Sequence, residues 1–128
     1  MPLLLDTHAL LWWIADSGRL SGRARLAIAD ETNDIIVSAA SAWEIATKSR
    51  LGRLPGASAV AVDVAGTIRD QGFVPLPVGV RDAERAGWLP GPHRDPFDRM
   101  LAAQALARNL AVVSADEVLD GFGVRRIW

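Results

Sequence analysis

The sequence has 128 residues, half of them hydrophobic, and its 14 basic and 15 acidic side chains leave a net charge of −1, which gives no general support for nucleic-acid binding. This length predicts one domain, residues 1–128, and the absence of cysteine excludes disulfides and thiolate metal sites and fits a reducing cytosol. No apolar run approaches the roughly 18 residues of a membrane span, and the N-terminus carries no basic leader, so we expect a cytoplasmic protein with no signal peptide.

The first half of the chain alternates short apolar runs with helix signals. Leu3–Leu5 is wholly apolar, as in strands that are buried on both faces of a parallel sheet. Ser21 can cap one helix, and Gly52 can end another. The elements predicted here are a strand at 3–5, helices at 7–15 and 22–30, a strand at 34–37 and a helix at 38–50.

The second half continues this alternation. Ser58 can cap a long helix that ends before Gly72, and two prolines make 73–78 a short or edge strand. The elements predicted here are helices at 58–71 and 80–86, a loop at 87–96, an amphipathic helix at 97–108 and strands at 110–114 and 124–128. Alternating strands and helices predict an α/β fold, a three-layer α/β/α sandwich with a central parallel sheet of four to five strands.

Two acidic residues lie just beyond the carboxyl ends of predicted strands. Asp6 ends the first strand, and Asp116 follows the strand at 110–114. In open parallel sheets, ligands bind beyond the carboxyl ends of the strands, so both acids are placed for function. The structural alternatives are that Asp6 caps the next helix and that Ser114 and Asp116 form a turn.

Glu44 has two readings. Ser41 and Glu44 match a capping box, in which the glutamate bonds back to the cap. Ser38 is an equally good cap, and a helix that begins there places Glu44 nearly two turns in, facing the crevice. Lys48, four residues later, could pair with Glu44 on the helix surface.

The segment from His93 to Arg99 is the densest cluster of charged residues. Asp95 precedes a proline and can cap a helix that has Pro96 at its first position. Asp98 follows on the same face of the first turn. Helix N-termini favour carboxylates, which is the structural explanation, but two acids and a histidine exceed what capping requires.

A doubly wound sheet would bring all these acids to one crevice. Crowded carboxylates repel one another unless a cation neutralises them. Oxygen ligands suit Mg²⁺ or Mn²⁺, which can polarise a phosphodiester and activate water. The pattern therefore indicates a metal site that acts on phosphate esters.

Four blocks in this order resemble the signature of PIN-domain ribonucleases, and the closest resemblance is to VapC-type toxins. The blocks are LLLDTH at 3–8, SAWEI at 41–45, HRDPFDRMLAAQA at 93–105 and VVSAD at 112–116. The resemblance implies an Mg²⁺- or Mn²⁺-dependent endoribonuclease and the toxin of a type II toxin–antitoxin pair. It also implies a homodimer and a small antitoxin partner.

The resemblance assigns roles to particular residues. Asp6, Glu44 and Asp98 match the family's three core acids, and Asp116 matches a fourth, more variable one. Each of the four is expected to be catalytic and to bind metal. The secondary residues are expected to orient acids, to bind metal or to contact phosphate: Thr7, His93, Asp95, Arg99 and Ser114. Arg99 could touch substrate phosphate or pair with an acid, and the family often has threonine where Ser114 stands.

Two rival functions are a catalytically silent PIN-like interaction module and an aspartyl-nucleophile phosphatase. The phosphatase reading needs a second aspartate two residues after Asp6, where His8 stands instead. All four family acids are present, so nothing in the sequence favours the silent module. Metal titration with RNA would separate these readings.

Aromatic and basic residues suggest contacts outside the acids. Trp12 and Trp13 are adjacent in a predicted helix and cannot both face the core, so we expect one at a dimer or antitoxin contact, with core packing as the alternative. Lys48, Arg50 and Arg53 could track RNA phosphates or could simply form a solvated helix end.

Overall fold

The computed structural model describes residues 1–128 and contains a five-stranded sheet in which every neighbouring pair is parallel. The strands are β1 (Pro2–Leu5), β2 (Asp34–Ser38), β3 (Val74–Leu76), β4 (Ala111–Val113) and β5 (Arg125–Ile127), in the spatial order β3-β2-β1-β4-β5. The predicted fold class is therefore confirmed, and the proline-containing strand β3 lies at an edge as expected.

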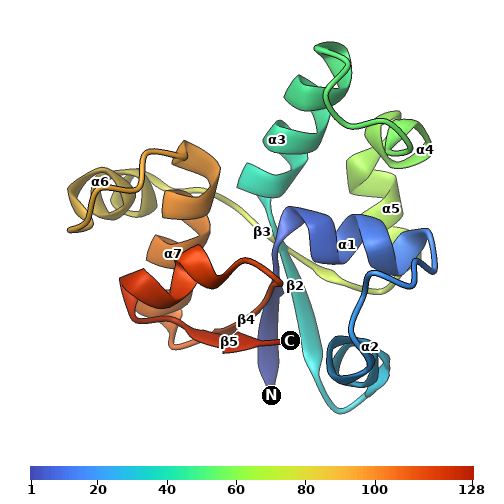
Figure 1. Ribbon diagram of the computed structural model, residues 1–128, viewed down its shortest axis with the longest axis horizontal. Coiled ribbons are helices and arrows are strands. Elements are labelled where there is room, and N and C mark those ends of the chain that lie inside the picture. The colour runs from blue at the N-terminus through green and yellow to red at the C-terminus, as the bar shows by residue number, and fades with distance from the viewer.

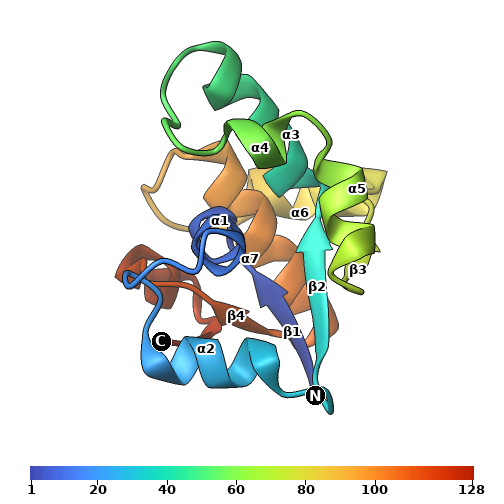
Figure 2. The ribbon, with the colours of Figure 1, turned by 90° about the vertical axis from the view of Figure 1, so that its right-hand side faces the viewer.

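Helices cover both faces of this sheet (Figures 1 and 2). They are α1 (Thr7–Ile14), α2 (Gly22–Ala29), α3 (Ala39–Arg50), α4 (Ser58–Ala61), α5 (Val64–Asp70), α6 (Val80–Trp88) and α7 (Pro96–Arg108), with a 3-10 helix η1 (Glu117–Phe122). Helices α6 and α7 lie on one side of the sheet, and α1, α2, α4 and α5 lie on the other (Figure 1). None of the helices is long and apolar enough to cross a bilayer.

The central strand β1 joins two hydrophobic cores. Because successive side chains of a strand point to opposite faces, Leu3 and Leu5 pack on the side of α1, whereas Leu4 packs against Leu101 of α7. All three leucines of β1 are fully buried. The apolar run that predicts a doubly covered strand thus fixes the carboxyl end of β1, where Asp6 follows.

The long helix predicted at 58–71 is wrong, because the chain forms two short helices there. Ala57 precedes α4 without a side-chain cap, so Ser58 is not the cap that we expected. The second helix, α5, starts afresh at Asp63, whose carboxylate accepts a hydrogen bond of 2.9 Å from Gly66 N. A Cβ at Gly66 would lie 2.3 Å from Asp63 Oδ2, so this close cap depends on glycine. Helix α6 in turn runs to Trp88, into the predicted loop.

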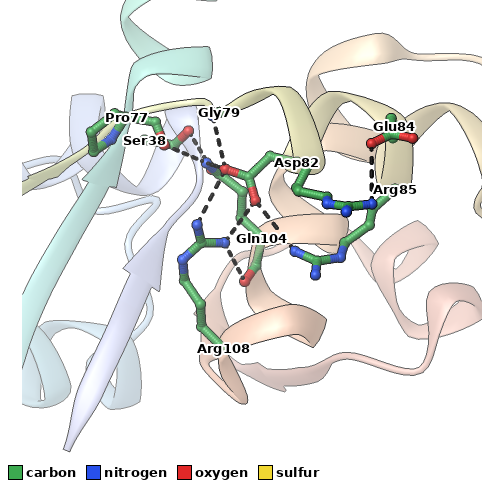
Figure 3. A network of polar contacts seen from close by, with 9 residues as sticks. Ser38, Pro77, Gly79, Asp82, Glu84, Arg85, Gln104 and Arg108 are labelled. Atoms are coloured by element: carbon green, nitrogen blue, oxygen red, sulfur yellow. Dashed lines mark hydrogen bonds and ion pairs between the residues drawn. The ribbon is translucent and has the colours of Figure 1, made fainter.

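Helix α7 is not the amphipathic helix that the sequence predicts. Its residues 101–105 are buried in succession, because α7 lies against the sheet and also packs on α6. The buried polar residue in this run, Gln104, donates to Pro77 O at 3.0 Å and to Asp82 Oδ2 at 3.1 Å. The side-chain oxygen Oε1 of Gln104 accepts a hydrogen bond of 2.6 Å from Ser38 Oγ (Figure 3). Gln104 therefore ties α7 to α6 and to the start of α3.

Candidate active site

The candidate acids reach the carboxyl end of the sheet from four elements. Asp6 and Asp116 follow β1 and β4, which are neighbouring strands. Glu44 lies in the second turn of α3, which leaves β2, and Asp98 lies in the first turn of α7. The fold thus directs four side chains from distant parts of the sequence toward one end of the sheet.

Asp6 combines a structural and an electrostatic role. Its Oδ1 accepts a hydrogen bond of 2.8 Å from Ala9 N, so it caps α1 as the structural alternative held. Burial raises the pKa of Asp6 to about 6, opposed by hydrogen bonds from Ser114 and Ala9 and by the charge of His8, and the charge of Asp98 adds to the rise. Asp6 and Asp98 are therefore electrostatic neighbours although 92 positions separate them.

Asp98 is held by a histidine. His93 Nε2 lies 2.9 Å from Asp98 Oδ2. Burial raises the pKa of Asp98, the hydrogen bond from His93 opposes this, and the charges of Asp95 and Asp116 raise it further. The charge of Asp116 thus acts on Asp98, and the charge of Asp98 acts on Asp6.

Glu44 is buried and has two partners. Ser38 accepts a hydrogen bond of 3.0 Å from Ala40 N and is the cap of α3, so the capping-box reading of Ser41 is wrong. The carboxylate of Glu44 accepts hydrogen bonds from the Thr7 hydroxyl and from the Lys48 ammonium. Thr7 adjoins Asp6, so this contact places Glu44 beside the end of β1.

Asp95 and Asp116 both act as helix caps. Asp95 Oδ1 accepts hydrogen bonds of 2.8 Å from Phe97 N and 3.2 Å from Asp98 N, and Pro96 follows at the first helical position. Asp116 accepts a bond of 3.0 Å from Val118 N at the start of η1. Ser114 Oγ accepts from Asp116 N at 2.9 Å and also hydrogen-bonds Asp6. Ser114 thus links the two acids that follow strands.

Arg99 does not pair with an acid, and that part of the prediction is wrong. Its guanidinium donates to the carbonyl oxygens of Ala86 at 2.9 Å and His93 at 2.9 Å, and also to that of Leu89. Arg99 therefore fastens the loop before α7 and with it the backbone of His93. The sequence carries no signal for this role, because the acceptors are backbone carbonyls of the last turn of α6 and of the loop that follows it.

The acids fit an oxygen-ligated divalent cation only as an open site. No group of three His, Asp or Glu side chains is arranged to hold a metal ion by itself. Glu44 contacts Lys48, and Asp98 contacts His93. Mg²⁺ commonly binds through one or two carboxylates and keeps several waters. Asp6 and Asp98, whose pKa values are both raised by burial, could serve as the carboxylates of such a site.

Two other tryptophans are exposed in place of Trp12 and Trp13. Trp12 packs between His8 and Trp128 with tilted rings, whose centroids lie 5.4 and 5.7 Å away, and Trp13 donates to Gln71 Oε1 at 3.0 Å. The exposed tryptophans are Trp43 on α3, at 63%, and Trp88 at the end of α6, at 86%. The adjacency of Trp12 and Trp13 does not predict which tryptophans are exposed, because Trp128, which follows the last strand, packs against Trp12.

Comparisons with known proteins agree on one family. The PIN-domain model matches residues 3–123. Ribonuclease VapC22 of Mycobacterium tuberculosis is 31% identical over 91% of this chain and 88% of its own length. Among solved structures, the fold is similar to VapC20 of Mycobacterium tuberculosis, a toxin that cleaves the sarcin–ricin loop (TM-score 0.65, 18% identity, 95% of each chain). It is also similar to VapBC2 of Rickettsia felis bound to promoter DNA (TM-score 0.65, 14% identity, 98% and 97%).

Proposed function

The chain belongs to the PIN-domain family, and we propose that it is a metal-dependent endoribonuclease that acts in the cytoplasm as the toxin of a type II toxin–antitoxin pair. The observation that carries this proposal is the placement of four acids at the carboxyl end of the sheet, where Asp6 and Asp116 follow β1 and β4 and where α3 and α7 carry Glu44 and Asp98 in their first two turns. Ribonuclease VapC22, similar over 91% of the chain, supports RNA as the substrate class.

The roles proposed for the residues follow from their contacts. Asp6 and Asp98 would hold Mg²⁺ or Mn²⁺, and Glu44 and Asp116 would complete the acidic site. When bound, the ion supplies positive charge that polarises a phosphodiester and makes water a better nucleophile. Thr7 orients Glu44, Ser114 orients Asp6, and His93 orients Asp98, each by a hydrogen bond. Asp95 would serve mainly as the cap that sets the first turn of α7.

The proposed partners are a small antitoxin and a second copy of the chain. The similarity to a VapBC complex supports the antitoxin. Exposed Trp43 and Trp88 support protein contacts, because aromatic side chains are enriched at interfaces. Two apolar grooves of about 700 and 360 Å³ flank α3 and provide further surface for such contacts.

The decisive experiment compares cleavage by the wild type and by Asp6→Asn. Asparagine keeps a cap acceptor for Ala9 N but removes the charge that would hold the ion. We expect the wild type to cleave single-stranded RNA with Mg²⁺ or Mn²⁺, chelator to stop it, and Asp6→Asn to lose at least about 100-fold in rate, on the order of 3 kcal/mol of transition-state stabilisation.

The matched control is Asp34→Asn, which removes a carboxylate at the first residue of β2, the opposite end of that strand. It should cleave at the wild-type rate. Full activity of Asp6→Asn would refute the proposal. A wild type that binds divalent ions but cleaves no RNA would favour the silent interaction module.

A further inference from the structure

Lysine occurs once in this chain, at Lys48, among 14 basic side chains of which the other 13 are arginine. Lysine and arginine differ in ways that matter at a phosphate site. Lysine carries a compact point charge on a flexible stem, whereas arginine presents a rigid planar fork. Lys48 is therefore the only flexible point charge of this kind that the chain can present to a phosphate.

Lys48 stands beside the acids. It lies one turn after Glu44 on α3, and its ammonium forms an ion pair with that carboxylate. Its Nζ also lies 5.6 Å from the centre of the Phe97 ring, on α7 next to Asp98. The charges of Asp95 and Asp98 act on Lys48 as well. One cation thus bridges the two helices that deliver Glu44 and Asp98.

The ammonium of Lys48 has spare hydrogen-bonding capacity. A lysine ammonium carries three N–H donors, and Glu44 is its hydrogen-bonded acceptor here. The side chain is 28% exposed, so the remaining donors have access to solvent. Contacts to Glu44 and to the Phe97 ring hold the charge in place at the rim of the site.

Two arginines near the acids are engaged elsewhere. Arg99 donates to backbone carbonyls of Ala86 at the end of α6 and of His93 in the loop before α7. Arg126, whose charge interacts with Asp116, pairs with Asp120 at 2.9 Å and donates to Ser114 O at 3.1 Å. Arg50 and Arg53, the other members of the basic run around Lys48, have no ion pair with these acids. Lys48 alone of that run faces them.

We propose that Lys48 contacts a phosphate of bound RNA and holds the strand against the acidic site. This inference rests on the proposed ribonuclease function. A phosphodiester that approaches four carboxylates is repelled, so a cation at the rim lowers the cost of binding. Phosphate contacts of this kind fix the position of a nucleic acid without reading its sequence.

The competing explanation is that Lys48 only pairs with Glu44 along the helix. Under that explanation, Lys48→Met would lower the melting temperature, because it leaves the buried Glu44 carboxylate without its cation, and would leave RNA binding as it was. The salt dependence of RNA binding separates the two, because it counts phosphate contacts.

The test measures binding of a fluorescein-labelled, mixed-sequence single-stranded RNA by anisotropy over a series of salt concentrations, in chelator so that cleavage cannot occur. Each phosphate contact contributes about 0.7 to the slope of log Kobs against log salt for single strands. We expect Lys48→Met to reduce that slope by about 0.7 and Lys48→Arg to restore most of it. Cleavage assays in Mn²⁺ should show a raised KM for Lys48→Met that Lys48→Arg largely restores, since the contact serves binding.

The matched control is Arg23→Met, which removes one positive charge from α2, at the opposite end of the strands from α3 (Figure 2). Its slope should equal that of the wild type. A Lys48→Met slope equal to the wild-type slope overturns the inference while the nuclease proposal stands. Failure of the wild type to bind RNA even at low salt overturns the inference as well. A wild type that binds but never cleaves would count against the proposed function alone.

Discussion

Asp6 shows how one residue can satisfy two explanations. Its carboxylate caps α1 and is also the acid whose pKa rises most clearly by burial and by the nearby charge of Asp98. Capping by itself needs only an acceptor, which asparagine or serine also supplies. A buried carboxylate beside another one is costly to ionise, so its presence here points to a cation that offsets the cost.

The raised pKa of Asp6 predicts how stability depends on pH. The folded chain holds this proton up to about pH 6, whereas the unfolded chain releases it near 3.8. Ionisation of Asp6 therefore costs the folded state progressively as pH rises from about 4 to 6. In chelator, Asp6→Asn should be more stable than the wild type above pH 6, by up to roughly 3 kcal/mol, and the difference should shrink toward pH 4.

Urea unfolding at a series of pH values measures this difference directly. The control is Asp34→Asn, which should track the wild type at every pH in this range. A wild type as stable as Asp6→Asn at pH 7 to 8 would contradict the account of Asp6 as a destabilised functional carboxylate.

At the scale of single residues, the sequence predicts where the acids lie along the strands and helices, but it does not predict most of the side chains and carbonyls that they and the basic residues contact. The end of an apolar strand and the Asp-Pro start of a helix are local signals, and Asp6 and Asp95 sit where those signals put them. The acceptors of Arg99 are backbone carbonyls at the end of α6 and in the loop after it, and Phe97, which Lys48 contacts, comes from another helix. Such long-range contacts leave no local pattern to read.

At the scale of elements, the network around Asp82 fixes α6 and α7. Asp82 is buried, and it accepts hydrogen bonds from Arg108 at 2.9 and 3.2 Å and from Gln104 and Gly79 (Figure 3). Although burial alone would raise it, the hydrogen bonds and charge of Arg108 help to lower the pKa of Asp82 to about 2. This contribution to stability is present above about pH 4 and is lost as pH falls toward 2.

Arg108→Met should destabilise the fold by about 3 kcal/mol, because it leaves a buried carboxylate without its main cation. Arg85→Met is the matched control. Arg85 approaches the same carboxylate only to 4.0 Å and is more exposed, so its loss should cost well under about 1 kcal/mol. Equal losses of unfolding free energy in the two variants would show that the bidentate contact of Arg108 stabilises the fold no more than the distant contact of Arg85 does.

Element boundaries were predictable where capping residues set them and not where packing did. Ser38 and Asp95 marked the starts of α3 and α7 correctly. The break between α4 and α5 depends on Asp63, which caps α5 by accepting a hydrogen bond from Gly66 N. Asp63 lies inside the apolar pattern that predicts one continuous helix. Residues 101–105 are buried because both α6 and the sheet cover α7. The spacing of polar residues in the sequence does not predict that a helix will be covered on two sides.

For the whole molecule, the alternation of strands and helices was sufficient to predict a parallel three-layer fold. Crossover connections leave few arrangements for such a pattern, so topology followed from element order. The exposed tryptophans were not predictable in this way. Trp12 packs against Trp128, which follows the last strand, and Trp43 remains exposed beside the groove between α3 and α7.

The proposed metal site requires that folding bring Asp6 and Asp98 close enough to bind one divalent ion. Anomalous X-ray scattering from crystals soaked in Mn²⁺ tests it most directly, with Asp98→Asn crystals as the comparison. We predict an anomalous peak between these two carboxylates in the wild type that weakens strongly in Asp98→Asn. Manganese bound only elsewhere on the surface, or a peak of equal strength in Asp98→Asn, would contradict the claim.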